Sequence, residues 1–229
     1  MTRDELAKIF DHSILKPNAT TTDVIQGCNI ARKERMGLVM IQPHFVELTR
    51  KQLVNSGILV GTVMSFPHGC DLPTVKAYSA AKLSAAGADE IDMVINIAAV
   101  IENNLDLVIG DIAGVVKAAQ GKIIKVILET SYLTRNQIAA AAQACVVAGA
   151  HFVKTSTGFS DKGATVDDVL LMRQIVGSGI GVKAAGGIRT LDQALAMLKA
   201  GANRLGVSAS VAILKEWDER IGANGEISI

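Results

Sequence analysis

The stretch 148–159, AGAHFVKTSTGF, contains the features on which the fold prediction rests. It opens with the small-residue junction AGA, continues into a short apolar run, and ends in hydroxyl residues and glycine. A glycine such as Gly149 commonly ends a helix in a left-handed conformation just before a strand begins. We therefore predict a helix up to this junction, a buried strand through Lys154, and a loop that starts near Thr157.

The AGA junction recurs at 86–88 and 200–202, and short apolar runs alternate with longer amphipathic segments along the chain. This alternation is typical of repeated βα units. Eight strands are predicted, ending near Lys16, Gln42, Phe66, Asn96, Thr130, Thr157, Gly187 and Ser208. An α/β fold follows, a (β/α)8 TIM barrel that forms a single domain over 1–229. The rival, a doubly wound open sheet, should carry a GxGxxG turn after its first strand, and none is present.

The two ends of the chain are predicted to lie outside the repeat. A short N-terminal helix is expected over 1–10, and a loosely ordered tail from about 219 to 229, where the sequence is polar and contains glycine. The N-terminus lacks the apolar segment of a signal peptide, and no run reaches the length of a membrane span. We expect a cytoplasmic protein without membrane contact.

Composition narrows the class of function. Hydrophobic residues make up 49% of the chain but aromatic residues only 3%, which suits a parallel sheet covered on both faces. The net charge is +1, from 23 basic and 22 acidic residues without a basic run, so a nucleic-acid partner is not expected. Cysteines are widely spaced and histidines lack HxH or HExxH spacing. We therefore expect no disulfide framework, no metal site and no cofactor.

Lys154 stands in an apolar strand, where burial disfavours the charged ammonium and favours the neutral, nucleophilic amine. Such an amine can form a Schiff base with a carbonyl group. Asp92 and Lys154 each follow a junction glycine by five residues, so their side chains are expected to face the same way. Lys183 lies one βα unit further on and is expected beside Lys154. Taken alone, Lys154 could instead extend to the strand end and pair with a surface carboxylate.

Further residues are candidates for the same site. Lys125 belongs to the preceding strand, but its junction does not align cleanly, so whether it faces the site is left open. Three segments, 155–158, 184–188 and 206–210, could hold a phosphate by backbone N–H groups. The last two follow the seventh and eighth strands, where barrels often bind phosphate.

Several motifs follow one another over nearly the whole chain: DHSILKP (11–17), SFPHG (65–69), EIDMVIN (90–96), HFVKTSTGF (151–159), VKAAGGIRT (182–190) and RLGVSAS (204–210). Together they closely resemble the deoxyribose-phosphate aldolase family, and VKTSTGF is highly specific to it. The resemblance implies a class I, metal-free aldolase that reversibly cleaves 2-deoxy-D-ribose 5-phosphate to acetaldehyde and D-glyceraldehyde 3-phosphate. It also implies a homo-oligomer, a dimer or a tetramer, with a small sugar phosphate as its partner.

By the same resemblance, Lys154 is the Schiff-base lysine, while Asp92 and Lys183 act as proton donors and acceptors. Substrate and phosphate contacts are implied at Thr157, Gly158, Gly186, Gly187, Gly206 and Ser208. The chain departs from the family pattern at Met40, Gln42, Ala185 and Ala209, which puts acceptor range and phosphate affinity in question. Two alternatives therefore stay open: a related Schiff-base aldolase with a different or unphosphorylated acceptor, and a catalytically silent barrel that binds sugar phosphates.

Overall fold

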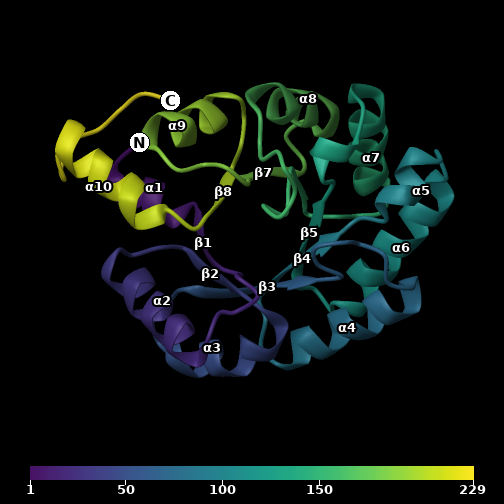
Figure 1. Ribbon diagram of the computed structural model, residues 1–229, viewed down its shortest axis with the longest axis horizontal. Helices are drawn as coiled ribbons and strands as arrows, with labels where there is room; N and C mark the ends of the chain where they lie inside the picture. The colour runs from purple at the N-terminus through teal and green to yellow at the C-terminus, as the bar shows by residue number, and fades with distance from the viewer.

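Eight parallel strands close into a barrel in which each strand pairs with the next and β8 pairs with β1 (Figure 1). The computed structural model describes residues 1–229. The strands are β1 (Phe10–Ile14), β2 (Leu38–Ile41), β3 (Leu59–Met64), β4 (Glu90–Val94), β5 (Ile123–Ile127), β6 (Phe152–Lys154), β7 (Gly181–Ala185) and β8 (Arg204–Val207). The predicted (β/α)8 barrel is thereby confirmed, and the open-sheet alternative is excluded.

Helices surround the barrel (Figure 1). They are α1 (Arg3–Lys8), α2 (Thr21–Lys33), α3 (Val46–Gln52), α4 (Pro73–Ala85), α5 (Ile97–Ile101), α6 (Leu105–Ala118), α7 (Arg135–Val147), α8 (Val166–Val176), α9 (Leu191–Lys199) and α10 (Ser210–Arg220), with 3-10 turns at Pro43–Phe45 and Thr130–Tyr132. Threonine side chains cap the N-termini of α2, α7 and α9 and so satisfy backbone N–H groups that a helix leaves free. None of these helices combines the length and the apolar character that crossing a membrane requires.

The strand positions agree closely with the sequence repeat. Each predicted exit lies one to three residues beyond the end of the observed strand. The three AGA junctions also behave as predicted, because Gly87, Gly149 and Gly201 have φ angles of 105°, 80° and 102°. These left-handed glycines end α4, α7 and α9 and turn the chain into the next strand.

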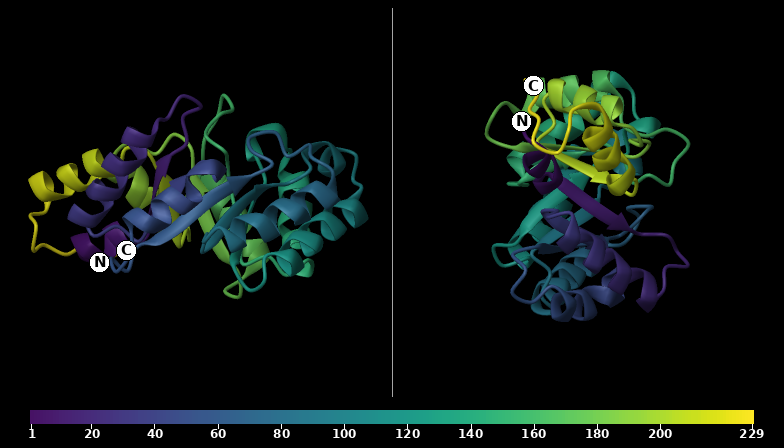
Figure 2. Two further views of the ribbon diagram at one scale, coloured as in Figure 1. Left: turned by 90° about the horizontal axis from the view of Figure 1, so that it is seen from below. Right: turned by 90° about the vertical axis from the view of Figure 1, so that its left-hand side faces the viewer.

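Both chain ends differ from the prediction. The N-terminal helix covers only Arg3–Lys8 rather than 1–10, because Phe10 already belongs to β1 and is fully buried. The segment predicted as a loose tail begins inside α10, and Glu226 then forms an antiparallel bridge with Thr2. Backbone hydrogen bonds between Met1 and Ile227 fix the two termini together. Figure 2 shows both ends at one side of the molecule, away from the loops that follow β1 and β6.

The barrel interior is divided into an apolar and a charged part. A large apolar core fills the space between the strands and the helices. Inside the barrel, the separate apolar cluster consists of Leu38, Met40 and Val63 on β2 and β3. The inward positions of the remaining strands are occupied largely by charged side chains, which are buried. Burying charges is costly unless they are paired, so this half of the interior needs a specific explanation.

Candidate active site

Lys154, Asp92 and Lys183 meet at the centre of the charged half. Lys154 ends β6, Asp92 is the middle residue of β4, and Lys183 lies opposite Lys154 in the β6–β7 register. The Asp92 Oδ2 atom accepts hydrogen bonds from Lys154 Nζ at 2.8 Å and from Lys183 Nζ at 2.7 Å. The structure therefore brings together the three residues that the sequence singled out, with one carboxylate oxygen between two amines.

Lys125 also points into this group, which settles its orientation. It lies opposite Asp92 in the β4–β5 register, and its Nζ donates to Asp92 Oδ1 and to Asp11 Oδ2, each at 3.1 Å. It also forms an ion pair with Glu90. Arg204 lies beside these acids, donating from Nε to Asp11 Oδ1 at 3.0 Å and from Nη1 to Glu90 Oε1 at 3.3 Å.

We call these seven residues the barrel cluster: Asp11, Glu90, Asp92, Lys125, Lys154, Lys183 and Arg204. Asp11 closes it by binding Lys183 as well as Lys125 and Arg204. Three carboxylates thus face four cationic side chains in a space from which water is largely excluded. One positive charge is in excess when every group is ionised.

The pKa values of the cluster residues are set by burial and by the charges of their neighbours. Burial disfavours the ionised form of Asp92, but the neighbouring Lys125, Lys154 and Lys183 outweigh it and hold the pKa of Asp92 well below its ordinary value. Burial likewise opposes ionisation of Asp11, yet its cationic neighbours lower its pKa. Both carboxyl groups are therefore anionic at neutral pH.

The two deeper lysines respond in opposite directions. Burial lowers the pKa of Lys125, but Asp11, Asp92 and Glu90 more than compensate and raise it above the ordinary value. For Lys183 burial prevails over the attraction of Asp11 and Asp92, and its pKa falls to about 8. The cluster can thus contain a neutral amine close to neutral pH, although the group with the lowered pKa is not the one that reaches the cavity.

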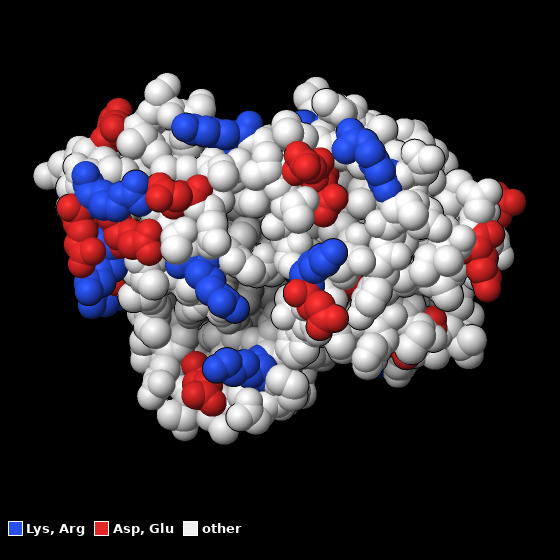
Figure 3. Space-filling model, turned by 45° about the horizontal axis from the view of Figure 1, so that its top comes forward, with Lys and Arg blue, Asp and Glu red and all other residues white.

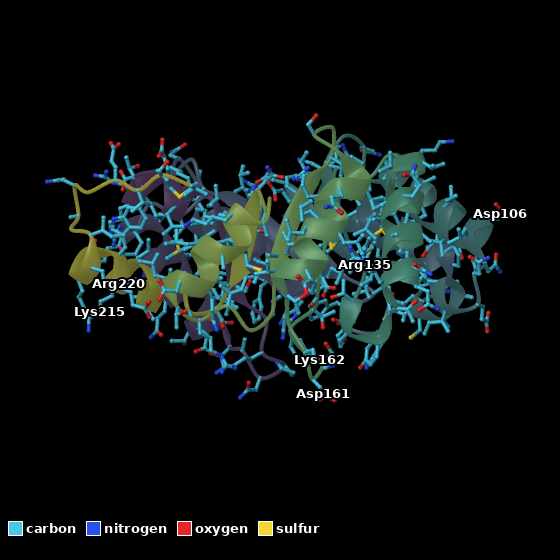
Figure 4. All side chains as sticks on the ribbon, turned by 90° about the horizontal axis from the view of Figure 1, so that it is seen from above. Asp106, Arg135, Asp161, Lys162, Lys215 and Arg220 are labelled. Atoms are coloured by element: carbon cyan, nitrogen blue, oxygen red, sulfur yellow. The ribbon has the colours of Figure 1, made fainter.

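A cavity of about 780 Å³ opens at the C-terminal ends of the strands, directly above the cluster. Lys154 lines it, whereas Lys183, Lys125 and Asp92 do not. The loops after β1 and β6 project on the same side (Figure 2), and Asp161 and Lys162 mark the tip of the latter in Figure 4. Figure 3 shows a hollow in this side of the molecule, with basic side chains beside it.

Every residue that was predicted to contact substrate or phosphate lines this cavity: Thr157, Gly158, Gly186, Gly187, Gly206 and Ser208. Gly206 has a second role, because a Cβ atom there would lie 2.8 Å from the Cβ of Ala185 and 3.0 Å from the Cε of Lys183. A side chain at this position would therefore displace Lys183. Glycine is needed here for space, which the sequence alone did not indicate.

The departures from the family pattern lie in different places. Ala185 lines the cavity, whereas Ala209 does not and instead occupies the N-cap position of α10 without a side-chain hydrogen bond. Met40 is buried in the apolar cluster inside the barrel. Gln42 donates from Nε2 to the backbone oxygen of Lys16 at 2.7 Å and so holds the loop after β1.

Sequence reasoning missed several residues of the site. Asp11, Glu90 and Arg204 complete the barrel cluster, and strand alternation could have found two of them, since Glu90 lies two residues before Asp92 and Arg204 two before Gly206. Lys16, Arg189 and His12 line the cavity. His12 hydrogen-bonds through Nδ1 to Ser210 Oγ at 2.7 Å, and burial lowers its pKa to about 4.

Comparison with known proteins identifies close relatives over nearly the full length. The family described as DeoC/LacD family aldolase matches residues 5–216. The deoxyribose-phosphate aldolase of Caldicellulosiruptor saccharolyticus is 47% identical over 219 residues, covering 94% of this chain and 100% of that protein. That of Streptococcus gordonii is 48% identical over 211 residues, covering 92% and 96%. The tetrameric deoxyribose phosphate aldolase from Aeropyrum pernix superimposes with a TM-score of 0.88 at 30% identity, covering 95% and 92%.

Proposed function

Because this chain belongs to the DeoC/LacD aldolase family, we propose that it is a class I aldolase that reversibly cleaves 2-deoxy-D-ribose 5-phosphate to acetaldehyde and D-glyceraldehyde 3-phosphate. The observation that carries the proposal is the position of one amine. Lys154 is the only lysine of the barrel cluster that lines the cavity, and it is held there by Asp92. The names of the relatives favour this enzyme over the two alternatives, an aldolase with an unphosphorylated acceptor and a barrel that binds sugar phosphates without catalysis.

In the cleavage direction, the neutral Lys154 amine attacks the C1 aldehyde carbon, and loss of water gives a protonated Schiff base. A proton then leaves the 3-hydroxyl group and the C2–C3 bond breaks. Its electron pair forms the C1–C2 double bond, and the pair of the C=N double bond moves to the nitrogen. Glyceraldehyde 3-phosphate departs and an enamine remains on Lys154. Protonation of its C2 and hydrolysis of the new Schiff base release acetaldehyde and restore the amine.

Asp92 and Lys183 are suited to move these protons. Both are hydrogen-bonded within the cluster, and neither lines the cavity, so the proton of the 3-hydroxyl group has to pass through a relay that includes Lys154 or a water molecule. Lys183, whose pKa is about 8, can both accept and return a proton near neutral pH. Lys125, with a raised pKa, remains charged and serves to balance the carboxylates.

The phosphate group fits the part of the cavity formed by the loops after β6, β7 and β8. Glycines Gly158, Gly186 and Gly187 let backbone N–H groups approach an anion closely, and Lys16 and Arg189 add positive charge at the cavity wall. These groups support a site for the anionic end of the substrate in this part of the cavity.

Assembly and location are part of the same proposal. A tetrameric relative at 30% identity supports a homo-oligomeric enzyme. Cys28, Cys70 and Cys145 are all free thiols, which supports a cytoplasmic protein. Sedimentation analysis of the purified enzyme tests the first point, since a monomer at all concentrations would contradict it.

Borohydride trapping with acetaldehyde, followed by peptide mass mapping, tests the chemistry directly. A reduced adduct is expected on Lys154 in the wild-type protein and none in Lys154→Ala. Lys215→Ala, which removes an exposed lysine on α10, is the matched control and should retain the adduct. An adduct located only on Lys183 or Lys125, or no adduct, would refute the assignment.

The substrate is tested by comparing kcat/KM for deoxyribose with and without its 5-phosphate. A strong preference for the phosphorylated sugar is expected, because several cavity residues are placed to bind the anion. Equal efficiency on both sugars would contradict a working phosphate site while leaving the Schiff-base chemistry intact. The two experiments therefore separate the reaction type from the substrate.

A further inference from the structure

Glu129 is a buried carboxylate that the proposed reaction does not use. It follows β5 by two residues, and only 2% of its surface is exposed. It does not line the cavity, and no lysine or arginine forms an ion pair with it. A buried acid without a cation must be stabilised by hydrogen-bond donors, and their identity indicates what the residue is for.

All the side-chain hydrogen bonds of Glu129 come from one loop. The backbone N–H of Thr157 donates to Oε1 and Oε2 at 3.3 and 3.2 Å, and the Thr157 hydroxyl donates to Oε2. Ser160 Oγ donates to Oε1 at 3.0 Å. The Thr157 hydroxyl in turn accepts from the Phe159 N–H at 3.0 Å. Glu129 thus holds the segment 157–160 at both ends, directly at Thr157 and Ser160, and reaches Phe159 through the Thr157 hydroxyl.

The same loop forms the wall of the cavity beside the nucleophile. Thr157, Gly158 and Phe159 all line the cavity, three to five positions after Lys154. Lys154 itself is held separately, by Asp92 on β4. Two independent sets of contacts therefore fix the reacting amine and the loop that binds the rest of the substrate.

The backbone of Glu129 has a strained conformation. Its φ and ψ angles are 54° and 64°, the left-handed region that a residue with a long side chain rarely adopts. The conformation turns the chain from β5 into the 3-10 turn Thr130–Tyr132. Strain of this kind persists where surrounding contacts impose it, and it is concentrated at functional sites.

We propose that Glu129 is a positioning residue that fixes the loop 157–160 in the conformation that binds the sugar phosphate. Its carboxylate acts through Thr157 and does not touch the reacting atoms. The inference rests on the proposed aldolase function and extends it to the origin of substrate affinity. Weakening the hydrogen bonds of the Glu129 carboxylate should raise KM for the sugar phosphate. Lys154 should still react with a small aldehyde, because such a molecule does not contact the loop.

The decisive variant is Glu129→Gln, because the amide places donors against the Thr157 N–H and hydroxyl. KM for deoxyribose 5-phosphate is expected to rise at least about tenfold, with a smaller change in kcat, since a charge-assisted hydrogen bond is lost. Borohydride trapping of acetaldehyde on Lys154 should stay at the wild-type level. Glu129→Asp, which keeps the carboxylate and tolerates the left-handed conformation better, should recover part of the affinity.

Two further variants control the experiment. Glu219→Gln makes the same chemical change on the exposed face of α10 and should behave as the wild type. Ser160→Ala removes one contact to Glu129, together with the contacts of the Ser160 hydroxyl to Ser131 and to the Lys162 carbonyl oxygen, and should raise KM severalfold. The inference can therefore be tested even if Glu129→Gln does not fold. An unchanged KM in both Glu129→Gln and Ser160→Ala would overturn the proposal. An equal loss of acetaldehyde trapping and of sugar-phosphate affinity would overturn it as well. Failure of the wild type to form any adduct would instead refute the aldolase function.

Discussion

The protein buries lysine–aspartate pairs in two places, and they are built on opposite principles. Between α4 and α6, Lys76 Nζ binds Asp111 Oδ2 at 2.6 Å and the Val94 carbonyl oxygen at 3.1 Å, with both side chains almost completely buried. This pair matches one cation to one anion and has no access to the cavity. Inside the barrel, seven charged groups share contacts, and Lys154 opens onto the cavity.

The difference lies in charge balance as well as access. The Lys76–Asp111 pair is neutral when both groups are ionised, and its contacts join α4, α6 and the end of β4. Burial raises the pKa of Asp111, and Lys76 opposes this rise. The barrel cluster has four cationic groups and three carboxylates, which favours the loss of one proton from an amine. Burial is the main cause that lowers the pKa of Lys183 to about 8, and the neighbouring Lys125 and Lys154 act in the same direction against the attraction of Asp11 and Asp92. The matched pair joins packed elements, whereas the unbalanced cluster supports the proposal of a reactive amine at Lys154.

The largest expected effect is that of Asp92→Asn, compared with the same substitution at Asp111. Asp92→Asn removes the carboxylate that holds both Lys154 and Lys183, and should lower kcat by about a thousandfold. Asp111→Asn makes the same substitution in the other buried site and should leave kcat of the folded enzyme within about twofold. Steady-state kinetics at a temperature where both variants are folded measure the contrast. Similar losses of kcat in the two variants would remove the distinction between the sites.

A smaller effect is expected from Lys183→Met, which leaves three cations and three carboxylates. The rate should fall about a hundredfold. In the wild type, kcat/KM should decrease as the pH falls below about 8, because Lys183 then retains its proton and the cluster contains less neutral amine. This dependence should disappear in the variant. A wild-type pH profile in Lys183→Met would show that Lys183 does not control the reaction.

The same residue links stability to pH. The pKa of Lys183 is about 8 in the folded protein and 10.5 in its ordinary state, so between these values the unfolded chain binds more protons. The free energy of unfolding contributed by this group therefore rises with pH from about 8 to 10.5 and is constant below 8. Urea titrations across this window should show a smaller rise in Lys183→Met than in the wild type.

Separating the Lys76–Asp111 pair should change stability rather than rate. Lys76→Met leaves Asp111 buried without a cation and should lower the free energy of unfolding by about 3 kcal/mol. The double variant with Asp111→Leu should recover most of this loss, because well-packed apolar side chains can replace a buried ion pair. Thermal and urea unfolding measure both. A double variant as unstable as the single one would mean that the pair does more than satisfy its own charges.

The sequence repeat predicted the barrel because each βα unit carries local signals, such as the left-handed glycine of the AGA junctions. Lys154, Asp92 and Lys183 were found because strand alternation and the repeat place them together. Asp11 was not found, because its partners lie on other strands, and its contact with Arg204, 193 positions away, forms only when β1 closes against β8. Glu129 was missed for a related reason, since its partners belong to another unit and its backbone conformation is not typical of glutamate.

The smallest expected effect concerns two alanines at positions where the family pattern has serine. Ala185 lines the cavity between Lys154 and the glycine loop, so Ala185→Ser adds a hydroxyl group that can bind the phosphate. KM for the sugar phosphate should fall about fivefold, the worth of one hydrogen bond, and KM for unphosphorylated deoxyribose should not change. Ala209→Ser is the matched control, because Ala209 caps α10 outside the cavity and a serine there should raise stability by about 0.5–1 kcal/mol without changing KM. If Ala209→Ser alone lowered KM, the phosphate would lie against the start of α10 rather than beside Ala185.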